Sequence, residues 1–155
     1  MASDRERRYW DSFCFLAVLN NEEPYASTCT QILEGAKKDS VELVISPLTM
    51  AETVRPRGAS APIPIEHQER ITDFFENDYM RFRIIDRLIA KRSQALCWNV
   101  GLHPRDALHV AVALEEGCDV LETRDGKLLR SNGLEGLTIR EPFWEIQTEM
   151  ANDKD

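Results

Sequence analysis

The sequence predicts an α/β fold in which helices flank a central, mainly parallel sheet in a three-layer sandwich. Short runs rich in β-branched and aromatic residues alternate along the chain with longer stretches of helical periodicity. This alternation is typical of strand–helix–strand units, whose right-handed crossovers place helices on both faces of the sheet. The predicted strands are residues 7–11, 41–46, 80–85, 119–122 and 137–140.

Capping residues indicate where the predicted helices begin. Asp11 stands where the first strand passes into a helix, and Asp86 can cap a later one. Ser46 or Thr49 can cap a short helix that carries Glu52 in its first turns. The second predicted helix has Pro24 in its first turn. The remaining predicted helices cover residues 13–19, 66–76 and 87–100.

Residues 103–126 are predicted to form a buried helix, a strand and a turn that together carry two acids. Asp106 opens a nearly all-apolar helix, Gly117 ends it, and Asp125 follows the next strand in a turn. Residues 55–64 hold three prolines and a glycine, which favours an exposed loop and no domain boundary. We therefore expect one domain over residues 1–144 and a polar tail over 145–155.

Composition narrows the class of protein. The net charge of −8 argues against a general affinity for nucleic-acid backbone, so any contact with nucleic acid has to be local. No apolar run approaches the ~18 residues that a membrane span needs, and we expect no membrane partner. The cysteines lack metal-type spacing, which favours a reducing, cytoplasmic location without disulfides. They are Cys14, Cys29, Cys97 and Cys118.

Four acids are expected at one edge of the sheet. Asp11, Glu52 and Asp125 follow strands, and the carboxyl ends of parallel strands share an edge. Asp106 starts a helix that should begin at the same edge. Taken singly, each acid can be a cap, a first-turn residue or a turn former. Together they repel one another, and a fold that gathers carboxylates usually does so around a hard cation such as Mg²⁺ or Mn²⁺. This points to phosphodiester hydrolysis.

Four segments, in order, resemble the PIN domain family, and most closely the ribonuclease toxins of VapBC toxin–antitoxin pairs. They are YWDS at 9–12, SPLTMAE at 46–52, RDALHVAVAL at 105–114 and DVLETRDGKL at 119–128. The resemblance implies a catalytic site of Asp11, Glu52, Asp106 and Asp125, with the metal on Asp11 and Asp106. It also implies Mg²⁺ or Mn²⁺ dependence, cleavage of single-stranded or loop RNA, a homodimer and a cognate antitoxin.

Two positions depart from the family pattern. Phe13 stands where many members carry Asn or Ser, and Lys127 stands where many carry a further acid. An aspartyl-phosphate phosphatase would need a second acid at Phe13, and a phosphoreceiver domain would need paired acids early in the chain. The alternative that stays open is a PIN-fold protein- or RNA-binding module that is catalytically weak. The residues expected to contact RNA are Arg105, Arg124, Thr123 and Lys127.

Several other side chains have two interpretations. His109 can support Asp106 by a hydrogen bond or be a satisfied core histidine. Phe15, Leu19 and Ile32 can belong to the core or to a groove for a dimer or antitoxin partner. Core or dimer packing, and not base stacking, is expected of Met50, Phe74, Phe75, Trp98 and Trp144.

Overall fold

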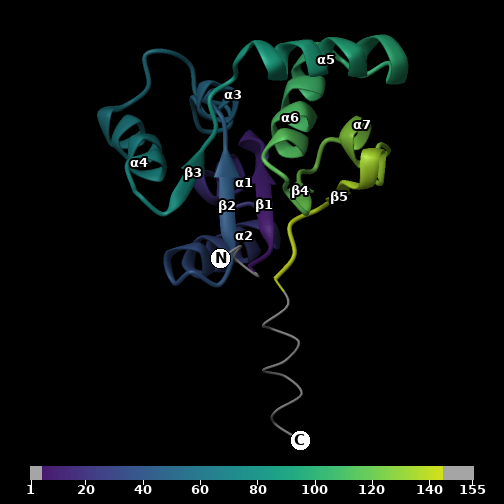
Figure 1. Ribbon diagram of the computed structural model, residues 1–155. Helices are drawn as coiled ribbons and strands as arrows, with labels where there is room; N and C mark the ends of the chain where they lie inside the picture. Colours follow the sequence, from purple (N-terminus) through teal and green to yellow (C-terminus); the bar gives the residue numbers. More distant parts are fainter. Residues whose placement is uncertain (1–4, 145–155) are drawn as a thin grey trace, which may run out of the picture.

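The computed structural model describes residues 5–144, and the tail expected over residues 145–155 lies outside them. Five parallel strands form one sheet in the order β3-β2-β1-β4-β5 (Figure 1). This confirms the predicted fold class. The strands are β1 (Arg7–Trp10), β2 (Glu42–Ile45), β3 (Met80–Phe82), β4 (Val120–Glu122) and β5 (Thr138–Arg140).

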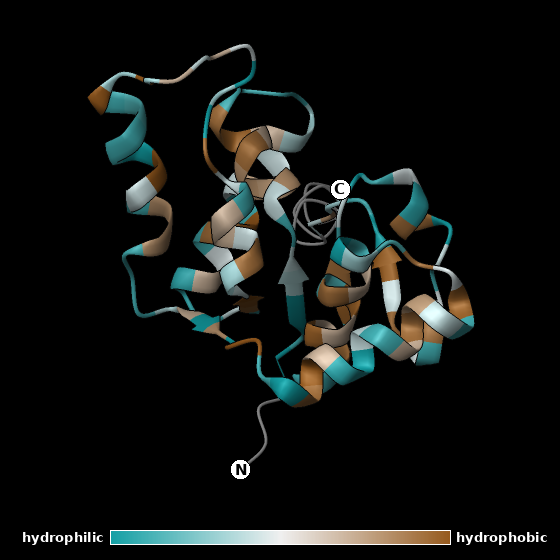
Figure 2. Ribbon diagram, turned by 90° about the horizontal axis from the view of Figure 1, so that it is seen from above, coloured by the Kyte–Doolittle hydropathy of each residue, from teal (hydrophilic) through white to brown (hydrophobic). Residues whose placement is uncertain are grey.

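Helices cover both faces of this sheet. They mix hydrophobic and hydrophilic residues along their lengths, as expected of helices with one buried face (Figure 2). Within residues 5–144 no helix is both long enough and apolar enough to cross a membrane. The helices are α1 (Ser12–Leu19), α2 (Tyr25–Lys37), α3 (Pro47–Glu52), α4 (Ile65–Phe75), α5 (Arg87–Val100), α6 (Pro104–Glu115) and α7 (Gly126–Leu129).

Alternation along the strands divides the core between the two faces. Tyr9 points to a cluster with α5 and α6, whereas the next residue, Trp10, points to a cluster with α1 and α2. Val44 and Leu43 of β2 divide in the same way. Because both faces are covered, these strands are apolar on both sides, as in other parallel sheets.

The carboxyl ends of the strands are where the helices begin. Asp11 directly follows β1 and caps α1, Ser46 follows β2 and caps α3, and Asp125 caps α7 after β4. Helix α5, capped by Asp86, runs across α6, so that α6 starts at this same edge (Figure 1). This crossing places Asp106, at the start of α6, at the edge expected from the sequence.

Three expectations about core residues are corrected or settled here. Trp98 is 76% exposed and Met50 is 47% exposed, so neither belongs to the core of this chain. The interpretation of Phe15, Leu19 and Ile32 as a docking groove is wrong, because all three are buried in the core. The thiols are free, as expected.

A buried carboxylate joins the end of β4 to the segment after β5. Glu122 is fully buried and accepts hydrogen bonds from Trp10 Nε1 at 2.9 Å and from the backbone N–H of Phe143 at 3.1 Å. Arg8 Nη1 lies 3.1 Å from its Oε2. This network fixes the end of β4, and Thr123 and Asp125 follow it directly.

Candidate active site

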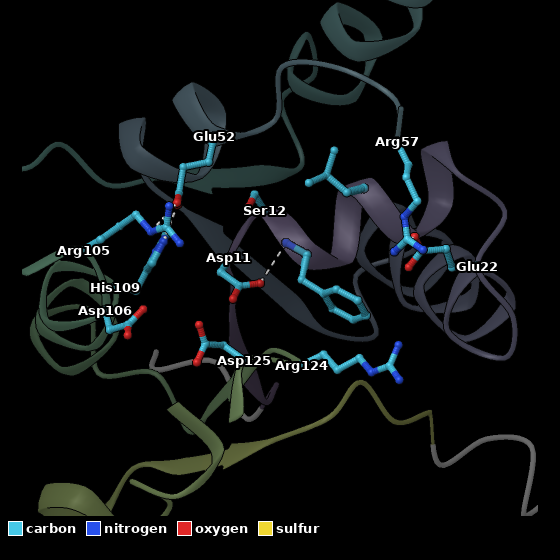
Figure 3. Close-up of a pocket in the computed structure, with 12 residues that line it drawn as sticks. Asp11, Ser12, Glu22, Glu52, Arg57, Arg105, Asp106, His109, Arg124 and Asp125 are labelled. Atoms are coloured by element: carbon cyan, nitrogen blue, oxygen red, sulfur yellow. Dashed lines mark hydrogen bonds and ion pairs between the residues drawn. The ribbon is translucent and has the colours of Figure 1, made fainter. Parts of the chain in front are cut away.

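A cavity of about 390 Å³ opens at the carboxyl edge of the sheet. All four acids predicted from the sequence line it, and they come from the ends of β1 and β4, from α3 and from α6 (Figure 3). The carboxylates of Asp11, Asp106 and Asp125 face a common space in this view, and Glu52 lies beside Arg105 and His109. Residues far apart in the sequence thus form one acidic site.

Asp11 is buried, and both of its carboxylate oxygens accept a hydrogen bond. One carboxylate oxygen accepts the Phe13 backbone N–H at 3.0 Å, and the other accepts the Thr123 hydroxyl at 2.5 Å. Burial raises the pKa of Asp11 to about 6, although these two hydrogen bonds lower it. Thr123, one of the residues expected to contact RNA, donates its hydroxyl to this carboxylate. Its own buried hydroxyl accepts the Asp125 N–H at 3.0 Å.

Asp106 and Asp125 face each other across the cavity. Burial, and then the charge of Asp125, raise the pKa of Asp106. Asp125 uses Oδ1 to accept the N–H groups of Lys127 and Leu128 at the start of α7. Its Oδ2, like both oxygens of Asp106, accepts no hydrogen bond from the residues that the structure describes. These oxygens are available to a ligand.

Glu52 is held in a clamp that the sequence did not predict. It is the last residue of α3, where the helix dipole does not favour a carboxylate. Two side chains of α6 hold it instead: His109 Nε2 lies 2.6 Å from Oε1 and Arg105 Nε lies 2.9 Å from Oε2. Arg105 and His109 are four residues apart, so they flank Asp106 on one side of the helix. The clamp therefore fixes Glu52 relative to Asp106.

Behind this clamp lies a buried hydrogen-bond chain. Tyr9 Oη lies 2.6 Å from His109 Nδ1 and 2.8 Å from Ser46 Oγ. Burial raises the pKa of Tyr9, which stays a phenol and can donate to His109. The Nε2–H of His109 then donates to Glu52. His109 is buried with both ring nitrogens engaged, which is the core-histidine interpretation, and it supports Glu52. Among residues 5–144 it forms no hydrogen bond to Asp106, the other interpretation.

Three arginines and an aromatic ring surround the acids. Arg105 is paired with Glu52, and Arg57 forms an ion pair with Glu22 at the far rim. The guanidinium of Arg124 lies 4.8 Å from the Tyr25 ring centre. Phe13, which departs from the family pattern, lines the cavity. Lys127, which was expected to contact RNA, lies in the adjoining hollow.

The donor set fits a hard divalent ion. No group of three or more His, Cys, Asp or Glu side chains within residues 5–144 forms a ready cage for a metal. Mg²⁺ and Mn²⁺ do not require one, because they bind one or two carboxylates and keep several waters. Asp11 and Asp106 offer such carboxylates, and the raised pKa of each indicates that a cation would relieve an electrostatic cost.

The comparisons with known proteins agree with this geometry. The PIN domain family matches residues 8–133, and the chain belongs to this family. No curated protein matches the sequence. The fold resembles that of a Mycobacterium tuberculosis VapC20 toxin that cleaves the sarcin-ricin loop, with a TM-score of 0.59, 13% identity and coverage of 77% of this chain and 90% of that one.

Two toxin–antitoxin structures have the same TM-score. The complex from Klebsiella pneumoniae is 19% identical, over 88% of this chain and 98% of that one. VapBC2 from Rickettsia felis, bound to a fragment of its promoter DNA, is 16% identical over 87% of this chain and 98% of that one. At these identities the likeness shows a shared fold.

Proposed function

We propose that this protein is a metal-dependent endoribonuclease that hydrolyses phosphodiester bonds, and that it is the toxin of a VapBC-type pair. The observation that carries the proposal is the convergence of Asp11, Glu52, Asp106 and Asp125 on one cavity in a PIN domain. Structural N-caps do not by themselves require such convergence, and mutual repulsion opposes it.

The contacts support different roles for the four acids. Asp11 and Asp106 would hold Mg²⁺ or Mn²⁺, and Asp125 has a further free oxygen at the same cavity. The partners of Asp11 are neutral groups, whereas the charge of Glu52 is already paired with the Arg105 guanidinium. This suits Glu52 better to orienting the attacking water than to binding the ion. A divalent ion, when bound, neutralises charge on the phosphate and favours ionisation of water.

The reaction is a hydrolysis. The water oxygen forms a new bond to phosphorus, the bond from phosphorus to the 3′-oxygen breaks, and that oxygen takes a proton. The products are a 5′-phosphate and a 3′-hydroxyl. Thr123 keeps Asp11 oriented, and the clamp of Arg105 and His109 keeps Glu52 in place, so that neither acid has to reorganise during the step.

Purified protein tests this assignment. We expect single-stranded RNA to be cut in Mn²⁺ or Mg²⁺ and not in EDTA, with 5′-phosphate ends. Asp11→Asn and Asp106→Asn should each lower kcat by about 100-fold or more, the range seen when a group that stabilises transition-state charge is removed. Turnover at the wild-type rate in either variant contradicts the assignment.

The toxin role rests on the neighbouring structures, two of which are toxin–antitoxin complexes. We propose RNA as the substrate, and a cognate antitoxin and a second copy of the chain as protein partners. Induced expression should arrest growth, and expression of Asp106→Asn should not. If both leave growth unchanged and Mn²⁺ supports no RNA cleavage, the protein is the binding module that the sequence left as the alternative.

A further inference from the structure

A second hollow of about 430 Å³ adjoins the acidic cavity between the starts of α6 and α7. It shares Asp106 and Asp125 with that cavity, and a third hollow of about 510 Å³ continues it past Ser131. We call the second and third hollows together the α6–α7 groove. The side chains that line both of its hollows are His103, Asp106, Lys127 and Arg130.

Two of the cations that line this groove, Lys127 and Arg130, have no carboxylate partner among residues 5–144. Lys127 lies on α7, and Arg130 is the C-cap residue of this helix with a helical backbone conformation. The two are three residues apart and therefore lie on one side of the helix. Leu128 between them is buried, and the Asp125 cap fixes the start of the helix. Neither Lys127 nor Arg130 forms an ion pair with any residue between 5 and 144. The helix that carries both charges is therefore fixed, and both charges are open to an anion.

The opposite rim of the acidic cavity differs in this respect. There Arg57 is already paired with Glu22, which is 18% exposed. An anion that approached Arg57 would have to displace that carboxylate, whereas at Lys127 and Arg130 it would meet unpaired charge. Arg124, which also lines that cavity, has no carboxylate partner among residues 5–144, but its guanidinium lies over the Tyr25 ring. Lys127 and Arg130, on the α7 side, are engaged neither by a carboxylate nor by a ring in the part of the chain that the structure describes.

Two further features favour an extended anion in the groove. Gly126 lines it and lacks a positive φ, so its backbone does not require glycine. A Cβ there would lie 3.6 Å from Arg130 Nη1, an ordinary contact that would narrow the groove. His103 Nδ1 accepts the Arg105 N–H at 3.3 Å, which leaves the Nε2–H of the neutral ring free to donate.

We propose that the α6–α7 groove binds a backbone phosphate of the RNA next to the one that is hydrolysed, so that the strand leaves the acidic cavity over α7. Lys127, Arg130 and His103 supply the contacts, and Gly126 leaves room for the strand. This inference rests on the proposed function, because it takes the ligand of the adjoining cavity to be RNA. A net charge of −8 makes such a local cationic groove necessary for RNA binding.

The test compares two double variants that remove the same charge. Lys127→Ala/Arg130→Ala empties the groove of unpaired cations, whereas Arg87→Ala/Lys91→Ala removes two exposed cations from α5. Binding of a fluorescent single-stranded RNA is measured by anisotropy in EDTA, where cleavage cannot interfere. The groove variant should bind about tenfold more weakly or worse, and the α5 variant within about twofold of wild type.

Salt dependence identifies the lost contacts as phosphate contacts. The slope of log K against log salt should become shallower by about 0.7 in the groove variant, because each neutralised phosphate of a single strand contributes about 0.7. The variant Lys127→Arg/Arg130→Lys should restore both affinity and slope. Gly126→Ala should fold at least as stably as wild type and bind RNA more weakly.

Failure of the two proposals can be told apart. If wild-type protein binds RNA but does not cut it with Mn²⁺, the proposed function fails. The RNA affinities of the two double variants, measured by anisotropy, still test the groove proposal. If wild type cuts RNA and the groove variant matches the α5 variant in affinity, slope and KM, the groove proposal is overturned. The same holds if both double variants weaken binding equally, since net charge alone then explains the effect.

Discussion

Asp11→Asn should abolish catalysis and stabilise the fold. Asp11 is buried, and its pKa is raised from 3.8 to about 6. Asparagine has nearly the same shape and caps helices as well as aspartate. Its carbonyl oxygen can accept the Phe13 N–H, and its NH2 group, which replaces the other oxygen, can donate to the Thr123 hydroxyl oxygen. The substitution therefore removes a buried negative charge with little change in packing.

The size of the stabilisation by Asp11→Asn follows from the raised pKa of Asp11. Because the folded pKa lies above the unfolded one, the carboxyl group contributes stability that is fully present below pH 3.8 and is lost as the pH rises through about 6. A rise from 3.8 to about 6 corresponds to about 3 kcal/mol, since one pH unit is worth about 1.4 kcal/mol. Asp11→Asn should be more stable than wild type by about 3 kcal/mol at pH 8, and the difference should vanish near pH 4.

Urea unfolding between pH 4 and pH 8 measures this difference, with EDTA present so that no divalent ion offsets the cost. Asp86→Asn is the control, because Asp86 is also an N-cap but is exposed and paired with Arg83. It should give no gain in stability at any pH. If Asp11→Asn is equally or less stable than wild type at pH 8, the electrostatic cost assigned to this site is refuted.

Three other substitutions have defined outcomes. Thr123→Val removes the donor that lowers the pKa of Asp11; the acidic limb of the pH–rate profile should move to higher pH, and an unchanged profile contradicts this. Tyr9→Phe leaves His109 Nδ1 without its phenol partner and should cost about 1–3 kcal/mol in urea unfolding and lower kcat more than it changes KM. Glu122→Gln leaves the buried Arg8 with only Glu6, among residues 5–144, as its counter-charge and should cost about 1–3 kcal/mol by thermal or urea unfolding; an unchanged stability would contradict the role given to this buried carboxylate.

The sequence was sufficient where the determining interaction is local. Asp11, Ser46 and Asp86 are N-caps in the structure because each accepts a backbone N–H two or three residues ahead. The positions of the acids at one edge follow from the same local signals, since a parallel sheet brings the ends of its strands together.

Partners across the fold were not predictable in this way. His109 pairs with Glu52 and not with Asp106 because of how α6 is rotated relative to α3. No local sequence pattern indicates this rotation. Trp98 was expected in the core or a dimer, but the buried face of α5 runs through Ile89, Ser93 and Leu96, and Trp98 lies off that face. A large apolar residue is therefore weak evidence for burial on its own.

The central claim is that Asp11 and Asp106 bind the divalent ion that RNA hydrolysis requires. The most direct measurement is the anomalous diffraction of crystals soaked in Mn²⁺, for the wild type and for Asp106→Asn. We predict a manganese peak between the carboxylates of Asp11 and Asp106 in the wild type, and its loss in the variant. A protein that cuts RNA in Mn²⁺ while its manganese lies elsewhere would contradict the claim.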